Sequence, residues 1–320
     1  MKGLTDIPGV KVGHVSDFEA LTGCTAILCA PGAVGGVEIR GSASGTEEIA
    51  TLDPGNINPV VHGILLAGGS AFGLEAASGV RRYLEGRGIG FPTGVAKVPI
   101  VPAAILFDLG IGKPNVRPNI AMGEAAAAAS TTDAVKEGCV GAGTGATVGK
   151  VLGMKQAMKS GVGSFTLALP GGVLVASLVA VNAVGDVRDP STGKIVAGAR
   201  KSPESREFAD AVEVLKHRPP PPLAGQNTTL AVVATNARLT KVEATKLAQL
   251  AGLGMARTIY PVNTMMDGDT VFALSAGDRR ADINSLGVAA AEAVAEAVLR
   301  AVRLTKSMGG LPGLGDEARR

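Results

Sequence analysis

Aromatic residues are scarce in this sequence, which holds no tryptophan, two tyrosines and seven phenylalanines among 320 residues. The net charge is only +3, and Lys and Arg form no stripe along the chain. A nucleic-acid-binding surface needs clustered positive charge and aromatic stacking platforms, so we exclude that class of function. No apolar run reaches the roughly 18 residues of a membrane helix, so we expect no membrane partner. The core must be built from Ala, Val, Leu and Ile.

Cysteine is also rare. Cys24, Cys29 and Cys139 form no C-x-x-C pair and are odd in number, which argues against a disulfide framework and against a zinc site. The N-terminal stretch MKGLTDIPGVKVGHVSD lacks the apolar core of a signal peptide. We therefore expect buried thiols in a protein of the reducing cytoplasm.

Histidine is limited to His14, His62 and His217. The first two lie in apolar stretches, where a histidine is more often structural, and the third abuts a proline run. A Ser-His-Asp or Cys-His nucleophile needs a histidine within reach, so the usual hydrolase arrangements are disfavoured. The chain has no HExxH motif and no Cys/His cluster, so nothing in the sequence suggests zinc.

Apolar runs and helical patterns alternate along the chain. Several runs are apolar throughout, as expected for strands of sheets that are covered on both faces. This alternation predicts a layered α/β sandwich. We expect strands at residues 25–29, 60–66, 104–109, 164–169, 173–181, 229–235 and 270–275. We expect helices at residues 72–85, 121–130, 202–217 and 282–303, and another after a capping box at 240–243.

A glycine-rich segment, GAGTGATVGK, spans residues 141–150. A phosphate-binding loop would need glycine where Thr144 stands and Ser or Thr after Lys150, where Val151 follows. The dinucleotide fingerprint fits only loosely, because no acidic residue follows near position 161 to hold a ribose. We therefore set nucleotide binding aside.

A proline run and a short polar step precede an apolar strand in PPPPLAGQNTTLAVV, residues 219–233. Without a histidine, a threonine hydroxyl can be activated by the α-amino group of its own residue, if that residue is a chain N-terminus. Thr228 is internal, so the chain would first have to cut itself by attack of Thr228 on the carbonyl of Asn227. An ordinary turn exit and a glycosylation sequon remain open as alternatives, and Thr229 is a weaker candidate because it should lie inside the strand.

Two aspartates flank a glycine in NTMMDGDTVFALS, residues 263–275, at the start of another strand. Alternate residues of a strand face the same way, so Asp267 and Asp269 could reach one site and hold an amine or a lysine. A β-turn built on the Asp-Gly pair is the alternative.

Four segments in this order resemble one known family: GGSAFGLEAASGV (68–80), GAGTGATVGK (141–150), NTTLAVVATNA (227–237) and NTMMDGDTVFA (263–273). They are similar to the L-aminopeptidase/D-esterase, or DmpA-type, peptidases, and the resemblance runs over nearly the whole chain. It implies a four-layer αββα sandwich like that of N-terminal-nucleophile hydrolases, with no metal or cofactor. It also implies self-cleavage of a single unit, 1–320, into an α fragment 1–227 and a β fragment 228–320, assembled as a homotetramer or larger.

The nearest branch is similar to the nylon-oligomer hydrolases, which cut amide bonds of 6-aminohexanoate oligomers. This resemblance implies that Thr228 is the nucleophile and that its own amine is the base. Lys150 would orient the hydroxyl or lower its pKa, and Asn182 would donate its amide to the oxyanion. Asp267 and Asp269 would hold Lys150 and the new amine in place.

The glycine loop differs between branches of the family. Gly143, Thr144 and Gly145 are expected to let the backbone approach the substrate amide. The β-aminopeptidase branch carries Tyr where this chain has Gly149, and Ser and Glu where it has the two aspartates. This argues against a tyrosine-assisted mechanism and a strict β-aminopeptidase specificity.

The sequence therefore predicts a self-processing amide hydrolase with an N-terminal threonine, acting on short peptides or linear amide oligomers, including 6-aminohexanoate oligomers. One alternative is an acyltransferase similar to ornithine acetyltransferases, which use a threonine and an amine acceptor. The other is an uncleaved, non-catalytic protein with the same fold.

Overall fold

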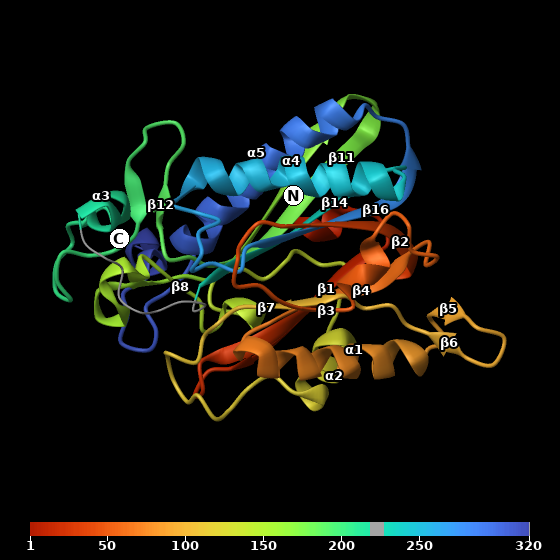
Figure 1. Cartoon of the computed structure of the whole chain (residues 1–320), viewed down its shortest axis with the longest axis horizontal. Coiled ribbons are helices and arrows are strands. Elements are labelled where there is room, and N and C mark those ends of the chain that lie inside the picture. Colours follow the sequence, from red (N-terminus) through yellow and green to blue (C-terminus); the bar gives the residue numbers. More distant parts are fainter. Residues whose placement is uncertain (218–226, 320) are drawn as a thin grey trace.

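A computed structural model describes residues 1–217 and 227–319 of the chain, so the proline run at 219–222 lies outside the described residues. Two β-sheets lie face to face, and each is covered on its outer side by helices (Figure 1). The sheets share one long strand, β2, whose residues 24–28 pair with one neighbour and residues 34–39 with another.

The first sheet has the order β10-β11-β14-β16-β2. Strands β14 and β16 are parallel, and the other neighbours are antiparallel. The strands of this sheet are β10 (Val162–Leu169), β11 (Val173–Asn182), β14 (Thr228–Ala237), β16 (Thr270–Arg279) and the second half of β2 (Thr22–Ile39). The two parallel strands are thus in the middle of this sheet.

The second sheet is built around the first half of β2, with β1 on one side and β4 on the other. Strand β7 extends it beside β4, and β3 pairs with β7. The bounds of these strands are β1 (Val10–Asp17), β3 (Gly45–Glu47), β4 (Val61–Ala67) and β7 (Ala103–Ile105).

Three stacked apolar layers hold the sheets and helices together. Strand β14 shows how one strand serves two of them, because its side chains alternate between the two faces of the sheet. Ala231 and Val233 pack toward α4 and α5, whereas Leu230, Val232 and Ala234 pack between the sheets. The third layer lies between the second sheet and helices α1 and α2. The predicted αββα sandwich is therefore confirmed.

The helices carry the start signals that the sequence shows. Thr240 and Glu243 form the expected capping box, and Asp282 accepts a hydrogen bond from Ser285 N at the start of α5. Between α1 and α2, a methyl group on Gly123 would lie 1.9 Å from a backbone oxygen of the opposite helix, so only glycine permits this packing. The helices are α1 (Ala76–Glu85), α2 (Ile120–Ala128), α3 (Ala211–His217), α4 (Lys241–Thr258) and α5 (Ile283–Arg303).

Two predicted elements differ in the structure. The helix expected at 202–217 is confined to α3, because Ser202 and Pro203 open a turn that is closed by the Ser205 N to Ser202 O hydrogen bond. Serine and proline at the first two positions favour a β-turn as much as a helix start. The strand expected at 104–109 is limited to β7.

Shorter elements connect the layers. None of the described helices is long and apolar enough to cross a membrane. The remaining strands are β5 (Phe91–Pro92), β6 (Lys97–Val98), β8 (Thr147–Val148), β9 (Met158–Lys159), β12 (Asp186–Arg188), β13 (Ile195–Ala197) and β15 (Ile259–Tyr260). The 3-10 helices are η1 (Leu4–Asp6), η2 (Ile49–Leu52), η3 (Ser70–Glu75), η4 (Gly141–Gly143), η5 (Lys150–Leu152), η6 (Met154–Gln156), η7 (Pro170–Gly172) and η8 (Leu314–Arg319).

Candidate active site

The predicted site residues meet at one end of the first sheet. Asn182 is the last residue of β11, and Thr228, the first residue of β14, lies directly opposite it in the antiparallel register. Asp267 and Asp269 precede β16, which runs parallel to β14. Adjacent strands thus bring residues that are far apart in the sequence to the same edge.

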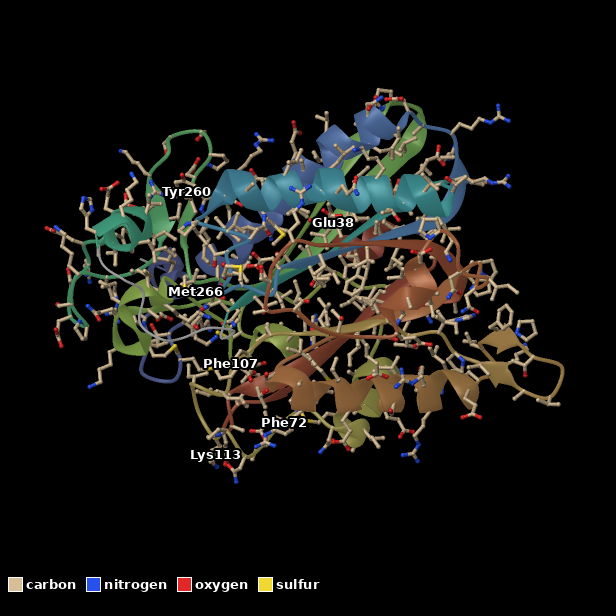
Figure 2. The ribbon with its side chains drawn as sticks, viewed as in Figure 1. Glu38, Phe72, Phe107, Lys113, Tyr260 and Met266 are labelled. Carbon is tan, nitrogen blue, oxygen red and sulfur yellow. The ribbon has the colours of Figure 1, made fainter. Side chains whose placement is uncertain are left out.

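The peptide bond between Asn227 and Thr228 is buried, and both residues are 2% exposed. The Thr228 hydroxyl donates to the carbonyl oxygen of Asn227, with 2.5 Å between Oγ1 and O. The same oxygen accepts a hydrogen bond from Gly268 N at 2.8 Å. The Asn227 side chain donates from Nδ2 to the carbonyl oxygen of Met266 at 3.2 Å (Figure 2 labels Met266). The nucleophile candidate therefore lies against the carbonyl that it would attack.

Lys150, the first residue of η5, reaches the site just after β8 and is 5% exposed. Its Nζ donates to the backbone oxygen and to Oδ1 of Asn182, each at 2.8 Å. Oδ1 also accepts from Thr147 N at 3.0 Å, whereas Nδ2 of Asn182 donates to the carbonyl oxygen of Phe107 at 2.9 Å. Phe107 is labelled in Figure 2. The Asn182 amide is thus fixed on both sides.

The two aspartates bind backbone groups on both sides of the site. Asp269 accepts from Thr229 N at 2.6 Å through Oδ1 and from Asn263 N at 2.8 Å through Oδ2. Asp267 Oδ2 accepts from the hydroxyl and the N–H of Thr264, at 2.6 and 3.2 Å. The Asp269 carboxylate therefore holds the start of β14 against the segment that precedes β16, whereas Oδ2 of Asp267 binds within this segment. The β-turn expected on the Asp267–Gly268 pair is not where the turn lies: it spans residues 264–267, and Asp267 N closes it by donating to Thr264 O.

Burial sets the charges of this cluster. It lowers the pKa of the Lys150 ammonium to about 7, against the opposing effect of the Asp267, Asp269 and Asp108 carboxylates. Burial, followed by the charge of Asp267, raises the pKa of Asp269 to about 7. Burial also raises the pKa of Asp267. The cluster can therefore gain or lose a proton near neutral pH, as acid–base chemistry requires.

The glycine loop supports the site through packing. The Thr144 hydroxyl is turned into the loop and donates to Gly141 O at 2.7 Å. A methyl group on Gly143 would lie 2.5 Å from a backbone nitrogen, and one on Gly145 would lie 2.2 Å from Leu21 O. These contacts explain the glycines without a substrate, and the expected approach to the substrate amide stays a prediction.

Three residues around the site were not singled out from the sequence. Gly268 contacts the Asn227 carbonyl; in the sequence it suggested only a turn. Asp108 is buried next to the site, and its position at the end of an apolar run was the available signal. Lys159 is also buried, and its Nζ donates to three backbone oxygens. Two belong to the glycine loop, Gly143 O at 3.3 Å and Ala146 O at 2.7 Å, and the third is Ser160 O at 2.7 Å.

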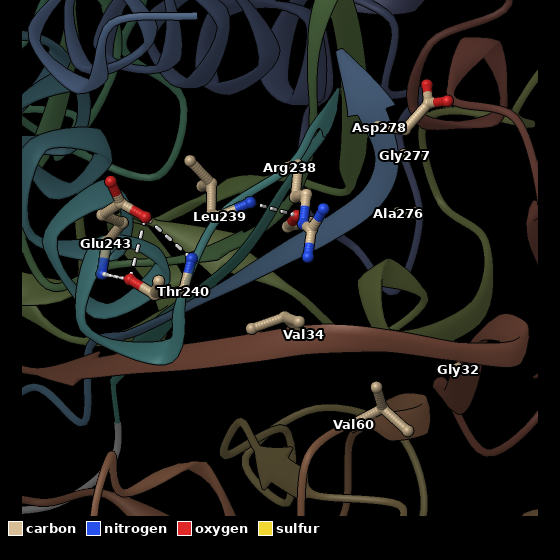
Figure 3. Close-up of a pocket in the computed structure, with 11 residues that line it drawn as sticks. Gly32, Val34, Val60, Arg238, Leu239, Thr240, Glu243, Ala276, Gly277 and Asp278 are labelled. Carbon is tan, nitrogen blue, oxygen red and sulfur yellow. Dashed lines mark hydrogen bonds between the residues drawn. The ribbon is translucent and has the colours of Figure 1, made fainter. Parts of the chain in front are cut away.

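A small cavity lies beside these buried charged residues, and a larger groove lies far from them. A cavity of about 20 Å³ is lined by Asp108, Thr147 and Lys150 together with neighbouring residues, which is room for about one water molecule. A groove of about 710 Å³ lies at the other end of β14 and β16, lined by residues such as Arg238 and Asp278 (Figure 3). Within residues 1–217 and 227–319, no three His, Cys, Asp or Glu side chains are grouped as a metal site requires.

Sequence comparisons place the chain among known hydrolases. A family model described as peptidase family S58 matches residues 2–314. An uncharacterized aminopeptidase of Mycobacterium leprae is 39% identical over an alignment of 350 residues, covering 98% of this chain and 93% of the relative. A 6-aminohexanoate-oligomer endohydrolase of Kocuria sp. is 33% identical over 314 residues, covering 93% of this chain and 85% of that protein.

Solved structures agree on the fold. The L-aminopeptidase D-Ala-esterase/amidase of Ochrobactrum anthropi, described as a variant of the Ntn-hydrolase fold, superposes with a TM-score of 0.72 at 20% identity, over 97% of this chain and 88% of that one. A β-aminopeptidase of Burkholderia sp. superposes with a TM-score of 0.68 at 24% identity, over 99% and 91%. These findings confirm the predicted resemblance. The chain is a hydrolase of peptide or amide bonds and belongs to peptidase family S58.

Proposed function

We propose that the chain cuts itself between Asn227 and Thr228 and then hydrolyses amides with Thr228 as an N-terminal nucleophile. One observation carries this proposal: the Thr228 hydroxyl lies 2.5 Å from the Asn227 carbonyl oxygen in a buried site. Attack of Oγ on that carbonyl carbon forms an ester and breaks the peptide C–N bond, and the nitrogen takes up the hydroxyl proton. Water then opens the ester, which leaves a carboxylate on Asn227 and a free amine on Thr228.

Different groups serve as the base in the two stages. Before the cut there is no α-amine at Thr228, so a different group must accept the hydroxyl proton. Lys150 is suited to this because its pKa is lowered to about 7 and it binds Asn182, the residue opposite Thr228. After the cut, the new amine has an ordinary pKa of about 7.7–8.0 and can serve its own hydroxyl.

The carboxylates position these groups during turnover. Asp269 binds Thr229 N, one residue after the new N-terminus, and is therefore close enough to orient the Thr228 amine. Asp267 and Asp269 both favour the charged form of Lys150. Asn182 would donate its amide to the substrate oxyanion, an effect worth about 2.7–4 kcal/mol per donor in comparable sites.

Self-cleavage would leave the two fragments interlocked. The β fragment, 228–320, would supply β14, which lies between β11 of the α fragment and β16 of its own. Ala231 and Val232 on β14 belong to the two apolar layers on either side of the sheet. The fragments could not separate without exposing these layers, so we expect them to stay together as one folded unit.

For substrates, we propose short peptides and linear amides with a free amine, including 6-aminohexanoate oligomers. The names of the relatives, an aminopeptidase and a 6-aminohexanoate-oligomer endohydrolase, support this range. Hydrolysis rates on α-, β- and ω-amino amides of matched length would rank these classes. Added amine acceptors in the same assay would reveal acyl transfer, since the transferred product differs in mass from the hydrolysed one.

Intact mass and N-terminal sequencing test the proposal directly. Purified protein incubated at neutral pH should yield two fragments, one of which begins with Thr228, and amidase activity should rise together with them. A full-length chain after long incubation, or a cut at another bond, would contradict the proposed self-cleavage.

A further inference from the structure

We propose that the backbone N–H of Gly268 is a catalytic group of the self-cleavage step, in which it stabilises the oxyanion that forms on the carbonyl oxygen of Asn227. This inference rests on the proposed function, because it concerns the cut before Thr228. It assigns the oxyanion donor of the first stage to a main-chain group of the β fragment.

The strand register places this donor. Strands β14 and β16 are parallel, with Leu230 opposite Thr270. The isolated parallel bridge between Asn227 and Asp267 continues the same offset, so Thr228 lies beside Gly268. In a parallel ladder an N–H donates to the carbonyl that precedes its partner residue. Gly268 N accordingly donates to the Asn227 oxygen at 2.8 Å, within the range of an effective oxyanion donor.

The reaction concentrates negative charge on that oxygen. As Thr228 Oγ forms its bond to the Asn227 carbonyl carbon, the carbonyl π electrons move onto the oxygen. They return to re-form the double bond when the C–N bond breaks and the nitrogen takes the proton. A donor that is already in place binds the oxygen more strongly as the charge grows and needs no reorganisation. It therefore stabilises the transition state more than the ground state, which lowers the barrier.

Two neighbouring N–H donors are engaged elsewhere. Asn182 Nδ2 donates to Phe107 O, and Thr229 N donates to Asp269 Oδ1. Gly268 N and the attacking hydroxyl both donate to the Asn227 oxygen. The hydroxyl loses its proton during attack, whereas the Gly268 N–H stays in place as a donor to the developing charge. Asn182 would then serve the later stage, with substrate.

The geometry also explains why residue 268 is glycine. A methyl group at this position would lie 2.7 Å from Thr228 Oγ1 and 2.6 Å from Ala43 O. Both contacts are shorter than real Cβ atoms make, and the second atom is backbone, so the strand segment or the hydroxyl would have to move. Glycine therefore permits the N–H and the nucleophile to meet at one carbonyl.

An amide-to-ester replacement tests this donor alone. Cell-free translation with a suppressor tRNA carrying glycolic acid places an ester at residue 268, which removes the N–H and adds no atoms beyond the backbone. Removing one oxyanion donor slows comparable reactions by about 10²–10³-fold, and we expect the same loss in the rate of cleavage before Thr228. The matched control is glycolate at Gly123, whose N–H donates to Asn119 O at 3.0 Å in helix α2 and should leave the rate unchanged.

The outcomes separate this inference from the proposed function. If the chain suppressed with ordinary glycine does not cut before Thr228, the proposed function fails. If that chain cuts and the folded ester-268 chain cuts within about threefold of its rate, the Gly268 N–H is not the stabilising donor. Gly268→Ala provides a second measurement if the ester chain does not fold. Normal cleavage by this variant at an unchanged Tm would show that the described packing of the N–H, hydroxyl and carbonyl is wrong.

Discussion

The two ends of strands β14 and β16 differ in what they bury. At their start, Lys150, Asp267 and Asp269 are enclosed next to the Asn227–Thr228 peptide bond. At their end, about 30 Å away for a strand of this length, the groove of about 710 Å³ is lined by exposed side chains such as Arg238 (Figure 3). The larger hollow thus lies at the end without buried charges.

The polar groups at the far end have structural partners. The Ser275 hydroxyl accepts from Leu239 N at 3.0 Å and donates to Ala237 O at 2.7 Å, and Thr240 is bonded to Glu243 in the capping box. At the near end, by contrast, the buried charges have pKa values displaced toward neutrality. Charges are costly to bury, so a cluster of them next to a nucleophile indicates chemistry better than the volume of a groove does.

The largest expected effect comes from the hydroxyl at the near end. Thr228→Ala should abolish self-cleavage and amidase activity, because it removes the hydroxyl that contacts the Asn227 carbonyl and no N-terminal nucleophile would form. Gel analysis and intact mass should show a full-length chain, and thermal unfolding should show that it is folded. Thr228→Ser, which keeps the hydroxyl, is the matched control and should still cut. If the alanine variant splits at the same bond, Thr228 is not the attacking group.

The two buried lysines allow the next test. Lys150→Met should slow self-cleavage by at least about 10²-fold, the usual contribution of acid–base catalysis, since it removes the group proposed to accept the Thr228 proton. Lys159→Met should mainly reduce stability, because three backbone oxygens lose their donor. Cleavage kinetics and thermal unfolding of both variants would separate the roles. If both variants lost cleavage equally and had the same Tm, Lys150 and Lys159 would not differ as a base and a stabilising residue.

Local sequence patterns predicted much of this arrangement. The apolar runs predicted most strands of both sheets, but not β1, β3 or the second half of β2. The polar step before an apolar run placed Thr228 at the start of β14. The capping box at Thr240 was visible because its residues are three positions apart. These features depend on neighbours in the sequence, so the sequence alone was sufficient.

Features that depend on distant contacts could not be predicted in the same way. The donor Gly268 N and its acceptor Asn227 O are 41 residues apart and meet only through the β14–β16 register. The sequence shows no sign that Lys159 is buried, because only the fold places its side chain among the carbonyls of the glycine loop. The helix expected from residue 202 was wrong because Ser-Pro is compatible with both a turn and a helix start, and tertiary contacts decide between them.

The pH dependence of cleavage tests whether the buried charges at the near end of β14 and β16 control the reaction. The near-end cluster should lose a proton near pH 7, so the rate of self-cleavage should rise with pH through this region as Lys150 becomes neutral. Asp267 raises the pKa of both Lys150 and Asp269. Asp267→Asn should therefore move the rising limb to lower pH. A shift to higher pH would show that Asp267 does not act on the group that controls cleavage.

At the far end we expect the smallest effect, and on stability alone. Thr240→Ala removes the side chain that accepts from Glu243 N at the start of α4. Loss of such a cap costs about 1 kcal/mol of unfolding free energy, which for a chain of this size lowers Tm by about 1–3 °C. Cleavage before Thr228 and amidase activity should be unchanged, because the cap is a full strand length from the site. If Thr240→Ala slowed cleavage while the chain stayed folded, the two ends of β14 would be coupled, and the division between a chemical end and a structural end would not hold.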